Sequence, residues 1–238
     1  MSDFAATRWT RVIQARGVSE EARLALSELC EAYYPPVLAF LRRERGDEDA
    51  ARELAQEFFR RLLAGAGVNG ADPARGKFRS FLLGAVKHFL ADERDRLMRE
   101  KRGGGVQPES LDDDHDHESS PGLSVADDRA LPPDALFDRQ WALTVLDRSF
   151  SALDAELAAE GKSRLIEVLK PWLIGAADHG DQRAAAEQLG LSGTAIRVAV
   201  HRLRQRFRDA VRNELRQTLT EGASVGDELR ALFAALAG

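Results

Sequence analysis

The chain has 238 residues, 44% hydrophobic and 31% charged, as is typical of a soluble globular protein of one or two domains. No apolar run approaches ~18 residues, which excludes a membrane-spanning helix, and the first residues lack the apolar core of a signal peptide. The single cysteine, Cys30, excludes an internal disulfide and predicts a reducing, cytoplasmic location; its apolar neighbours indicate a core thiol rather than a nucleophile.

The net charge of −5 conceals segments of opposite sign. Residues 75–102 hold nine Lys or Arg against four Asp or Glu, and residues 181–216 hold eight against four. Residues 103–134 hold nine acids against one Arg. Two basic segments therefore flank an acidic one, a distribution that favours a nucleic-acid partner despite the acidic total.

The first elements expected along the chain are helices, and strand signals are nearly absent. Residues 7–14 predict a short helix, and residues 21–34 predict a longer one with a single apolar stripe. Pro35 and Pro36 are expected to end that helix and to start another that runs to about Arg43, because proline lacks the N–H that a helix interior needs.

Two further helices are expected before residue 103. Asp47 begins the first, since an acid at a helix N-terminus interacts favourably with the helix dipole, and an apolar stripe continues this helix to Leu63. Residues 78–102 then form a long helix that is apolar early and charged late. Its aromatic side chains suit a core; in a basic setting they also suit stacking on unpaired bases.

The acidic segment is not expected to fold. Residues 103–133 are rich in Gly, Pro, Ser and Asp, which predicts a flexible linker. The run from Asp112 to Glu118 contains carboxylates and imidazoles, which bind divalent ions. A flexible segment lacks the preorganised ligands of a metal site, so we expect no bound metal, no cofactor and no catalytic centre.

The most distinctive segment is 183–208, within a second helical domain expected over residues 134–215. Residues 184–189 predict a short helix, Gly190 offers the left-handed conformation of a tight turn, and Ser192 can cap a second helix. The second helix carries arginines around an apolar face formed by Ile196, Val200, Leu203 and Phe207. A short helix, a tight turn and an Arg-rich helix are typical of a helix-turn-helix DNA reader.

A last amphipathic segment lies in residues 216–238. One helix face is expected to carry its apolar side chains: Val225, Leu229, Leu232, Phe233 and Leu236. Because an isolated helix of this length is marginal in water, that face should pack on another part of the protein. Either it completes the core of the second domain, or it bridges the domains and holds the free protein closed and inactive, with Gly222 and Gly226 as the hinge.

Taken in order, these segments resemble bacterial sigma factors of the extracytoplasmic-function group, over about residues 22–102 and 134–212. The helix of that family with the pattern D-x-E-D-L-V-Q-E-V-F-x-R-L is matched by AARELAQEFFRRL at 50–62. Its F-R-x-W-L is matched by FRSFL at 78–82. In the second block, L-G-I-S and R-L-H-R-A-R resemble LGLS at 189–192 and HRLR at 201–204.

The resemblance implies an all-α fold with two helical domains joined by the flexible acidic linker. The first domain, residues 1–102, would dock on core RNA polymerase and bind the minus-ten element. Residues 103–133 would be the linker, and residues 134–215 would read the minus-thirty-five element through the helix-turn-helix. Residues 216–238 are an extension beyond this plan. An anti-sigma factor or another regulator is a further partner that the resemblance admits, and membrane insertion is not expected.

The resemblance also implies three sets of site residues. Polymerase docking would use Asp49, Glu53, Gln56 and Glu57. Binding and melting of the minus-ten element would use Lys87, His88, Phe89, Arg94 and Arg96. Reading of the minus-thirty-five element would use Thr194, Arg197, Val198, His201, Arg202 and Arg204.

Some family positions differ in this chain. The first two acids of the docking helix fall on Ala50 and Arg52, the family Trp falls on Phe81, and the family Asn falls on His88. The departures at Ala50 and Arg52 predict a weaker or rearranged contact with polymerase, whereas those at Phe81 and His88 concern promoter opening.

Two other classes of function fit parts of the sequence. A stand-alone helix-turn-helix regulator would use the second domain without polymerase. An enzyme with a DNA-binding appendage would use the Asp/His run of residues 112–118 and a metal. Co-purification with core polymerase separates the first from a sigma factor, and metal analysis of chelator-treated protein separates the second.

Overall fold

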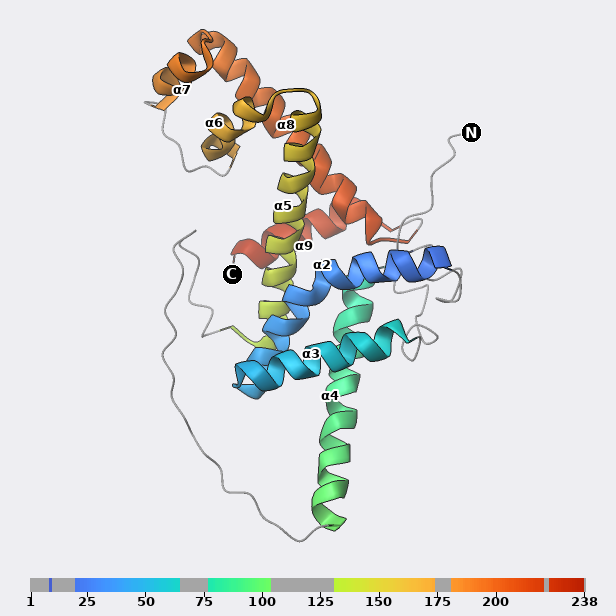
Figure 1. Ribbon diagram of the computed structural model, residues 1–238. Helices are drawn as coiled ribbons and strands as arrows, with labels where there is room; N and C mark the ends of the chain where they lie inside the picture. The colour runs from blue at the N-terminus through green and yellow to red at the C-terminus, as the bar shows by residue number, and fades with distance from the viewer. Residues whose placement is uncertain are drawn as a thin grey trace.

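The computed structural model describes Trp9 and residues 20–64, 77–103, 131–173, 181–220 and 223–237. Within these ranges the regular elements are α-helices, which confirms the predicted all-α class. They are labelled in Figure 1: α2 (Glu20–Arg45), α3 (Glu48–Leu63), α4 (Phe78–Gly103), α5 (Pro133–Ala159), α6 (Ser163–Leu173), α7 (Asp181–Leu189), α8 (Gly193–Gln217) and α9 (Val225–Ala237).

Several predicted features lie outside the described residues. They are the helix at 7–14 apart from Trp9, most of the linker, the run Asp112–Glu118, and Gly222.

The prediction that Pro35 and Pro36 end a helix is wrong, because α2 continues through both prolines. Figure 1 shows that α2 changes direction along its length, as helices do where proline removes a backbone hydrogen bond. Side chains on both sides of the pair are buried, including Tyr33 and Phe40. Packing of α2 against α3 and α5 offsets the lost bond and keeps the two segments in one helix.

The start of α3 follows the sequence prediction. Asp47 is its N-cap, and its side chain accepts a hydrogen bond from the Asp49 backbone N–H at 3.1 Å. One face of the helix is buried and consists of Ala51, Ala55, Phe58, Phe59 and Leu62. The opposite face is left for solvent or a partner.

The first hydrophobic core lies among α2, α3 and α4. Trp9 packs on Phe78 and Phe81, with ring centroids 4.9 and 5.1 Å apart, and Phe78 also meets the Tyr33 ring. Cys30 belongs to this core, and burial raises the pKa of its thiol to about 12. The prediction of a core thiol is therefore confirmed.

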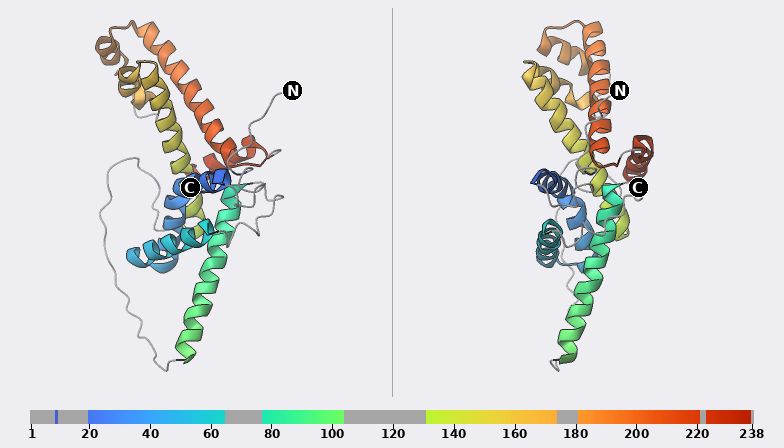
Figure 2. Two further views of the ribbon diagram at one scale, coloured as in Figure 1. Left: turned by 45° about the vertical axis from the view of Figure 1, so that its right-hand side comes forward. Right: turned by 90° about the vertical axis from the view of Figure 1, so that its right-hand side faces the viewer.

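Two long helices join this core to a second one. The N-terminal half of α5 contributes Trp141 to the first core, and the C-terminal half contributes Leu157 to the second. Helix α8 runs the opposite way, from Ile196 in the second core to Leu215 in the first. Figures 1 and 2 show α5 and α8 side by side between the two regions, and their contacts agree.

The second core contains α6, α7 and the adjoining halves of α5 and α8. Gly190 adopts a φ of 63° between α7 and α8, as the tight turn requires. The Ser192 hydroxyl accepts a hydrogen bond from the Ala195 N–H at 3.2 Å and caps α8. The predicted apolar face is also present, since Ile196 and Leu203 are buried.

Helix α9 packs against α5 and α8, so its apolar side chains do contact other parts of the protein. The predicted face is wrong at one position: Phe233 is 66% exposed, whereas Leu232 and Glu228 are buried. Residues four apart lie on the same side of a helix, so Glu228 shares the inner face with Leu232 and adjacent Phe233 turns outward.

Candidate polymerase and nucleic-acid interfaces

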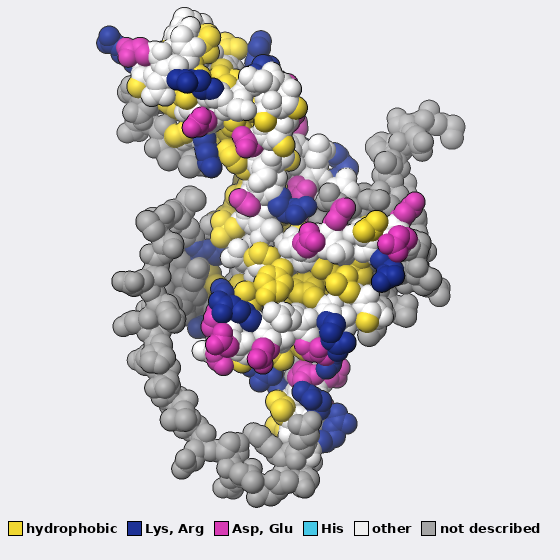
Figure 3. Space-filling model, viewed as in Figure 1, with side chains coloured by type: hydrophobic (Ala, Val, Ile, Leu, Met, Phe, Trp, Pro, Cys, Tyr) yellow, Lys and Arg dark blue, Asp and Glu magenta, His cyan; other side chains and the backbone are white. Residues whose placement is uncertain are grey.

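The outer face of α3 holds the predicted docking residues. Asp49, Glu53 and Gln56 are exposed, and Glu57 is partly buried. Figure 3 shows acidic and basic side chains interspersed along α3, with hydrophobic side chains gathered between α2 and α3. Asp49 pairs with Arg52 at 3.3 Å. This face therefore offers Glu53 and Gln56 most directly to a partner.

Glu57 has two partners within α3. Arg60 and Arg61 approach its carboxylate at 2.7 and 2.6 Å. Their hydrogen bonds lower the pKa of Glu57 to about 2. This carboxylate is thus ionised at neutral pH and is fixed in place by its own helix.

An ion-pair chain joins α3 to α4. Arg61 reaches Glu93 at 2.8 Å, and Arg96 reaches the same carboxylate at 2.7 Å. Glu93 is 4% exposed, so these partners satisfy a buried charge. The Arg61 guanidinium also lies 5.1 Å from the centroid of the Phe89 ring. The docking helix and the basic helix are therefore held together by charge as well as by apolar packing.

Most of the predicted minus-ten residues are already engaged within the protein. Lys87 pairs with Asp134 of α5, and Arg94 pairs with Glu44 of α2 at 2.7 Å. Phe89 is 6% exposed and packs on the Phe58 ring. The structure therefore places Phe89 in the core, which favours the core interpretation over base stacking in this arrangement.

His88 and the end of α4 are more accessible. His88 and Arg96 are exposed, although Arg96 pairs with Glu93 as described above. Leu97 and Met98 are also exposed, at 39% and 57%. No motif in the sequence distinguishes these two residues from their neighbours.

The predicted minus-thirty-five residues form one surface, with a single exception. Exposed positions on one side of α8 follow the helical spacing i, i+3, i+4, i+7 and i+8: Thr194, Arg197, Val198, His201 and Arg202. The Arg197 guanidinium lies 3.4 Å from the Thr194 hydroxyl. This surface begins at the N-terminus of α8, where helix dipoles favour phosphate. We refer to these five residues as the reader face.

Arg204 lies away from the reader face. Its guanidinium donates two hydrogen bonds to the Trp172 carbonyl, at 2.9 and 3.2 Å. Arg206 likewise faces the protein and pairs at 2.7 Å with Glu156 of α5 and at 2.6 Å with Glu160, the C-cap of α5. Hydrogen bonds from Arg206 and Lys162 lower the pKa of Glu160 to about 2. Of these four arginines of α8, Arg197 and Arg202 belong to the reader face, whereas Arg204 and Arg206 bond to other parts of the protein.

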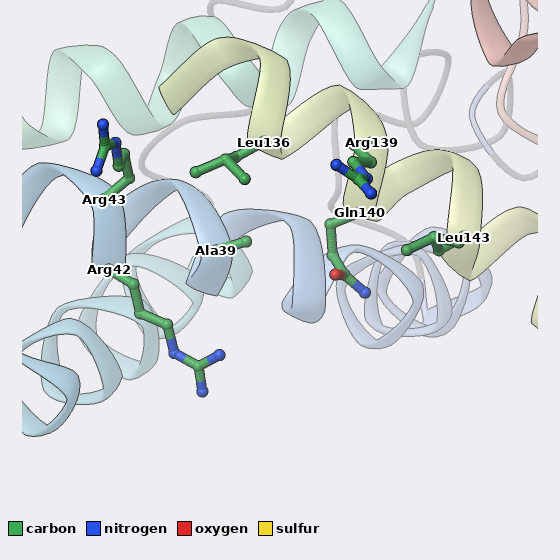
Figure 4. A pocket seen from close by; sticks show the side chains of 7 residues that line it. All are labelled: Ala39, Arg42, Arg43, Leu136, Arg139, Gln140 and Leu143. Carbon is green, nitrogen blue, oxygen red and sulfur yellow. The ribbon is translucent and has the colours of Figure 1, made fainter. Parts of the chain in front are cut away.

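A hollow of about 340 Å³ lies between α2 and α5. Figure 4 shows that Arg42 and Arg43, on its rim, point in different directions. Arg42 pairs with Glu48, and Arg43 donates to the Leu131 carbonyl at 3.1 Å. Arg42 and Arg43 therefore do not converge on one point in the hollow. Among the described residues, no group of three side chains could hold a metal ion.

No helix in the described ranges is long and apolar enough to span a membrane.

The family model for sigma-70 region 2 matches residues 29–100, from within α2 to near the end of α4. No curated protein and no solved structure matches the chain. The matched segment contains both the outer face of α3 and the basic helix α4. Residues 29–100 are thus similar to sigma-70 region 2, and this similarity supports a sigma factor acting with RNA polymerase in promoter recognition, not an enzyme.

Proposed function

We propose that this protein is a sigma factor of the extracytoplasmic-function group that directs core RNA polymerase to specific promoters. The observation that carries the proposal is the combination of two surfaces on one chain. One lies in the segment similar to sigma-70 region 2, and the other is the reader face of a helix-turn-helix. A stand-alone regulator would need only the second surface.

Core polymerase docks on the outer face of α3 in this proposal. Asp49, Glu53 and Gln56 contribute directly, because their side chains are exposed. Glu57 contributes a charge that Arg60 and Arg61 hold in place. The family acids replaced by Ala50 and Arg52 make this contact less acidic than the family pattern.

Helix α4 binds and opens the minus-ten element. Lys87, Arg94 and Arg96 supply cations for the phosphate backbone, and His88 is an accessible group for an unpaired base. Phe89 becomes available only if the packing around Arg61 and Phe58 changes. Its contribution therefore belongs to promoter opening rather than to the first encounter.

The reader face of α8 recognises the minus-thirty-five element. Arg197 and Arg202 are long cationic donors suited to guanine edges or phosphate, and Val198 offers an apolar contact. Thr194 lies where the helix N-terminus attracts phosphate. Arg204 supports the helix through Trp172 and contributes to DNA binding only indirectly.

The remaining assignments complete the proposal. Residues 1–102 and 134–215 are the two functional domains, and residues 103–133 are an acidic linker that mimics nucleic-acid charge inside polymerase. The protein acts in the cytoplasm, where transcription takes place and where its buried thiol stays reduced. An anti-sigma factor or another regulator is a further partner in this proposal.

Two new cations on the outer face of α3 test polymerase docking. In a Glu53→Lys, Gln56→Lys variant, both new cations lie on the exposed side of the helix, so the fold should persist. We expect this variant to lose co-purification with core polymerase. The matched control is Glu167→Lys with Gln188→Lys, at exposed positions of α6 and α7.

The control should bind polymerase as the unmodified protein does, and both variants should keep the same circular dichroism spectrum. A folded α3 variant that still elutes with core polymerase would place the docking face elsewhere.

A further inference from the structure

The inner face of α9 carries a buried charge. Glu228 is 0% exposed, and its carboxylate lies 2.7 Å from the Lys77 ammonium and 3.4 Å from the Arg79 guanidinium. Arg79 also pairs with Asp138 of α5 and lies 4.5 Å from the centroid of the Trp141 ring. A buried carboxylate is costly unless cations accompany it. The packing of α9 therefore depends on the cations at Lys77 and Arg79, at the start of α4.

Backbone contacts join the same regions. The Phe78 N–H at the start of α4 donates to the Thr218 carbonyl at 2.9 Å, directly after α8. Lys77 and Leu219 form an antiparallel bridge. Leu232 of α9 is 1% exposed and belongs to the first core. Residues 218–220 and 223–237 thus contact both the end of the reader helix and the first turn of the basic helix; we call these residues the C-terminal latch.

We call the arrangement in which α9 and α5 pack on the start of α4 the closed arrangement. In it, carboxylates from the C-terminal half of the chain pair with cations of α4 and with Lys77, which precedes α4. Asp134 holds Lys87, Asp138 holds Arg79, and Glu228 contacts both Lys77 and Arg79. DNA phosphates would need the same cations. The closed arrangement and DNA binding therefore compete for one set of charges, which gives DNA a higher affinity for an open form.

We propose that the C-terminal latch holds the free protein closed, with Glu228 as its central contact, and that nucleic acid displaces it by competing for the α4 cations. This inference deepens the proposed function, since it concerns regulation of the same DNA-binding helices. Its tests use no polymerase and no specific promoter. A failure here is therefore distinguishable from a failure of the proposed sigma activity.

The first test compares Glu228→Gln with Asp227→Asn. Both changes remove one negative charge from α9, but Asp227 is exposed and pairs along its own helix with Arg230. Binding is measured to a random-sequence DNA duplex over a range of salt concentrations. We expect Glu228→Gln to bind about tenfold or more tightly than Asp227→Asn, as removal of a closed-state penalty predicts.

The salt dependence gives a second readout. Each additional phosphate contact steepens the slope of log affinity against log salt by about 0.9. Release of Lys77 and Arg79 should therefore make the slope of Glu228→Gln steeper by up to about two such increments. Equal affinities and equal slopes for the two variants would overturn the proposal.

A conformational readout is independent of DNA. Spin labels at Phe233→Cys on α9 and Ala91→Cys on α4 report their separation, and both positions are exposed. Cys30 should stay unlabelled because it is buried. We expect one narrow distance distribution with Asp227→Asn and a broader, longer one with Glu228→Gln.

A reversible crosslink keeps the proposal testable even if Glu228→Gln fails to fold. Lys77 and Leu219 face each other in an antiparallel bridge, a geometry that brings Cα atoms within disulfide range. The Lys77→Cys, Leu219→Cys variant should bind DNA weakly when oxidised and at least about tenfold more tightly when reduced. Oxidised protein that binds as tightly as reduced protein would show that the latch does not oppose DNA binding.

Discussion

Individual arginines of α8 differ in what they can contribute to DNA binding. Arg197 and Arg202 are exposed on the reader face, whereas Arg204 and Arg206 bond to the protein. We expect Arg197→Ala and Arg202→Ala each to weaken promoter binding, by about 1–3 kcal/mol where the side chain reads a base. Competition binding with single-base promoter variants measures this effect. Unchanged affinity and salt slope in both variants would move the DNA surface off the reader face.

Arg204→Ala should behave differently. It removes the donor that satisfies the Trp172 carbonyl, so we expect a loss of stability of about 1 kcal/mol. Urea unfolding measures the loss, with Arg208→Ala as the control because Arg208 is exposed and bonds to Gln205 of its own helix. A normal unfolding midpoint together with relaxed promoter specificity would instead make Arg204 a base reader.

The lowered pKa values of Glu57 and Glu160 predict that the stability of the fold depends on pH. The folded protein lowers the pKa of each carboxyl from 4.5 to about 2 through hydrogen bonds from nearby cations. A carboxyl whose pKa is lower in the folded protein stabilises the fold at any pH above its pKa in the unfolded chain. This contribution is lost as pH falls from 4.5 to about 2. We therefore expect Glu57→Gln to be less stable than the unmodified protein at neutral pH.

That stability difference should shrink as acid protonates Glu57 in the unmodified protein. Thermal unfolding across this pH range, compared between the two proteins, measures it. A difference that stays constant down to the lowest pH would mean that the Arg60 and Arg61 contacts do not depend on ionised Glu57.

At the scale of elements, the turn between α7 and α8 depends on Gly190. Its φ is 63°, and an added Cβ would meet no atom within 4 Å, so the cost of Gly190→Ala is conformational rather than steric. We expect a loss of about 1–2 kcal/mol from placing a side chain in the left-handed region. Gly193→Ala is the matched control, since its Cβ also has open space and its φ is not positive.

The control should be neutral or slightly stabilising, because alanine favours helix more than glycine does. Chemical unfolding of both variants gives the comparison. Equal stabilities would show that the turn tolerates a side chain at Gly190.

Local elements were predictable from sequence where a local interaction decides them. Asp47 and Ser192 cap α3 and α8 as expected, and Gly190 forms the expected turn. The proline pair in α2 was misjudged because tertiary packing on α3 and α5 outweighs a local bond lost in the helix. The hydrophobicity of Phe233 predicts a buried position, but the structure buries Glu228 beside Leu232 on the inner face and leaves Phe233 exposed.

The candidate site was predictable only in part. Helical spacing places the five residues of the reader face on one side of α8, and all five are exposed; their role in DNA binding stays a prediction. The pairing of Lys87 with Asp134, or of Lys77 with Glu228, joins residues distant in sequence, and no periodicity signals it. A buried Glu looks the same in sequence as a solvated one.

At the scale of the whole molecule, the two cores share helices. Helices α5 and α8 each contribute side chains to both cores. The two cores are therefore connected by two continuous helices. The sequence predicted two domains separated by a linker, and these boundaries stay predictions. Which side chains the two halves share depends on long-range packing, which patterns of hydrophobicity do not specify.

The most direct test of the sigma-factor proposal is run-off transcription with purified core RNA polymerase on the promoter region of the protein's own operon. We predict a discrete transcript that appears only when this protein is added. The transcript should be lost with Glu53→Lys, Gln56→Lys, because that variant cannot dock. Specific binding to the same DNA without any transcript, and without a stable complex with core polymerase, would contradict the proposal and indicate a stand-alone regulator.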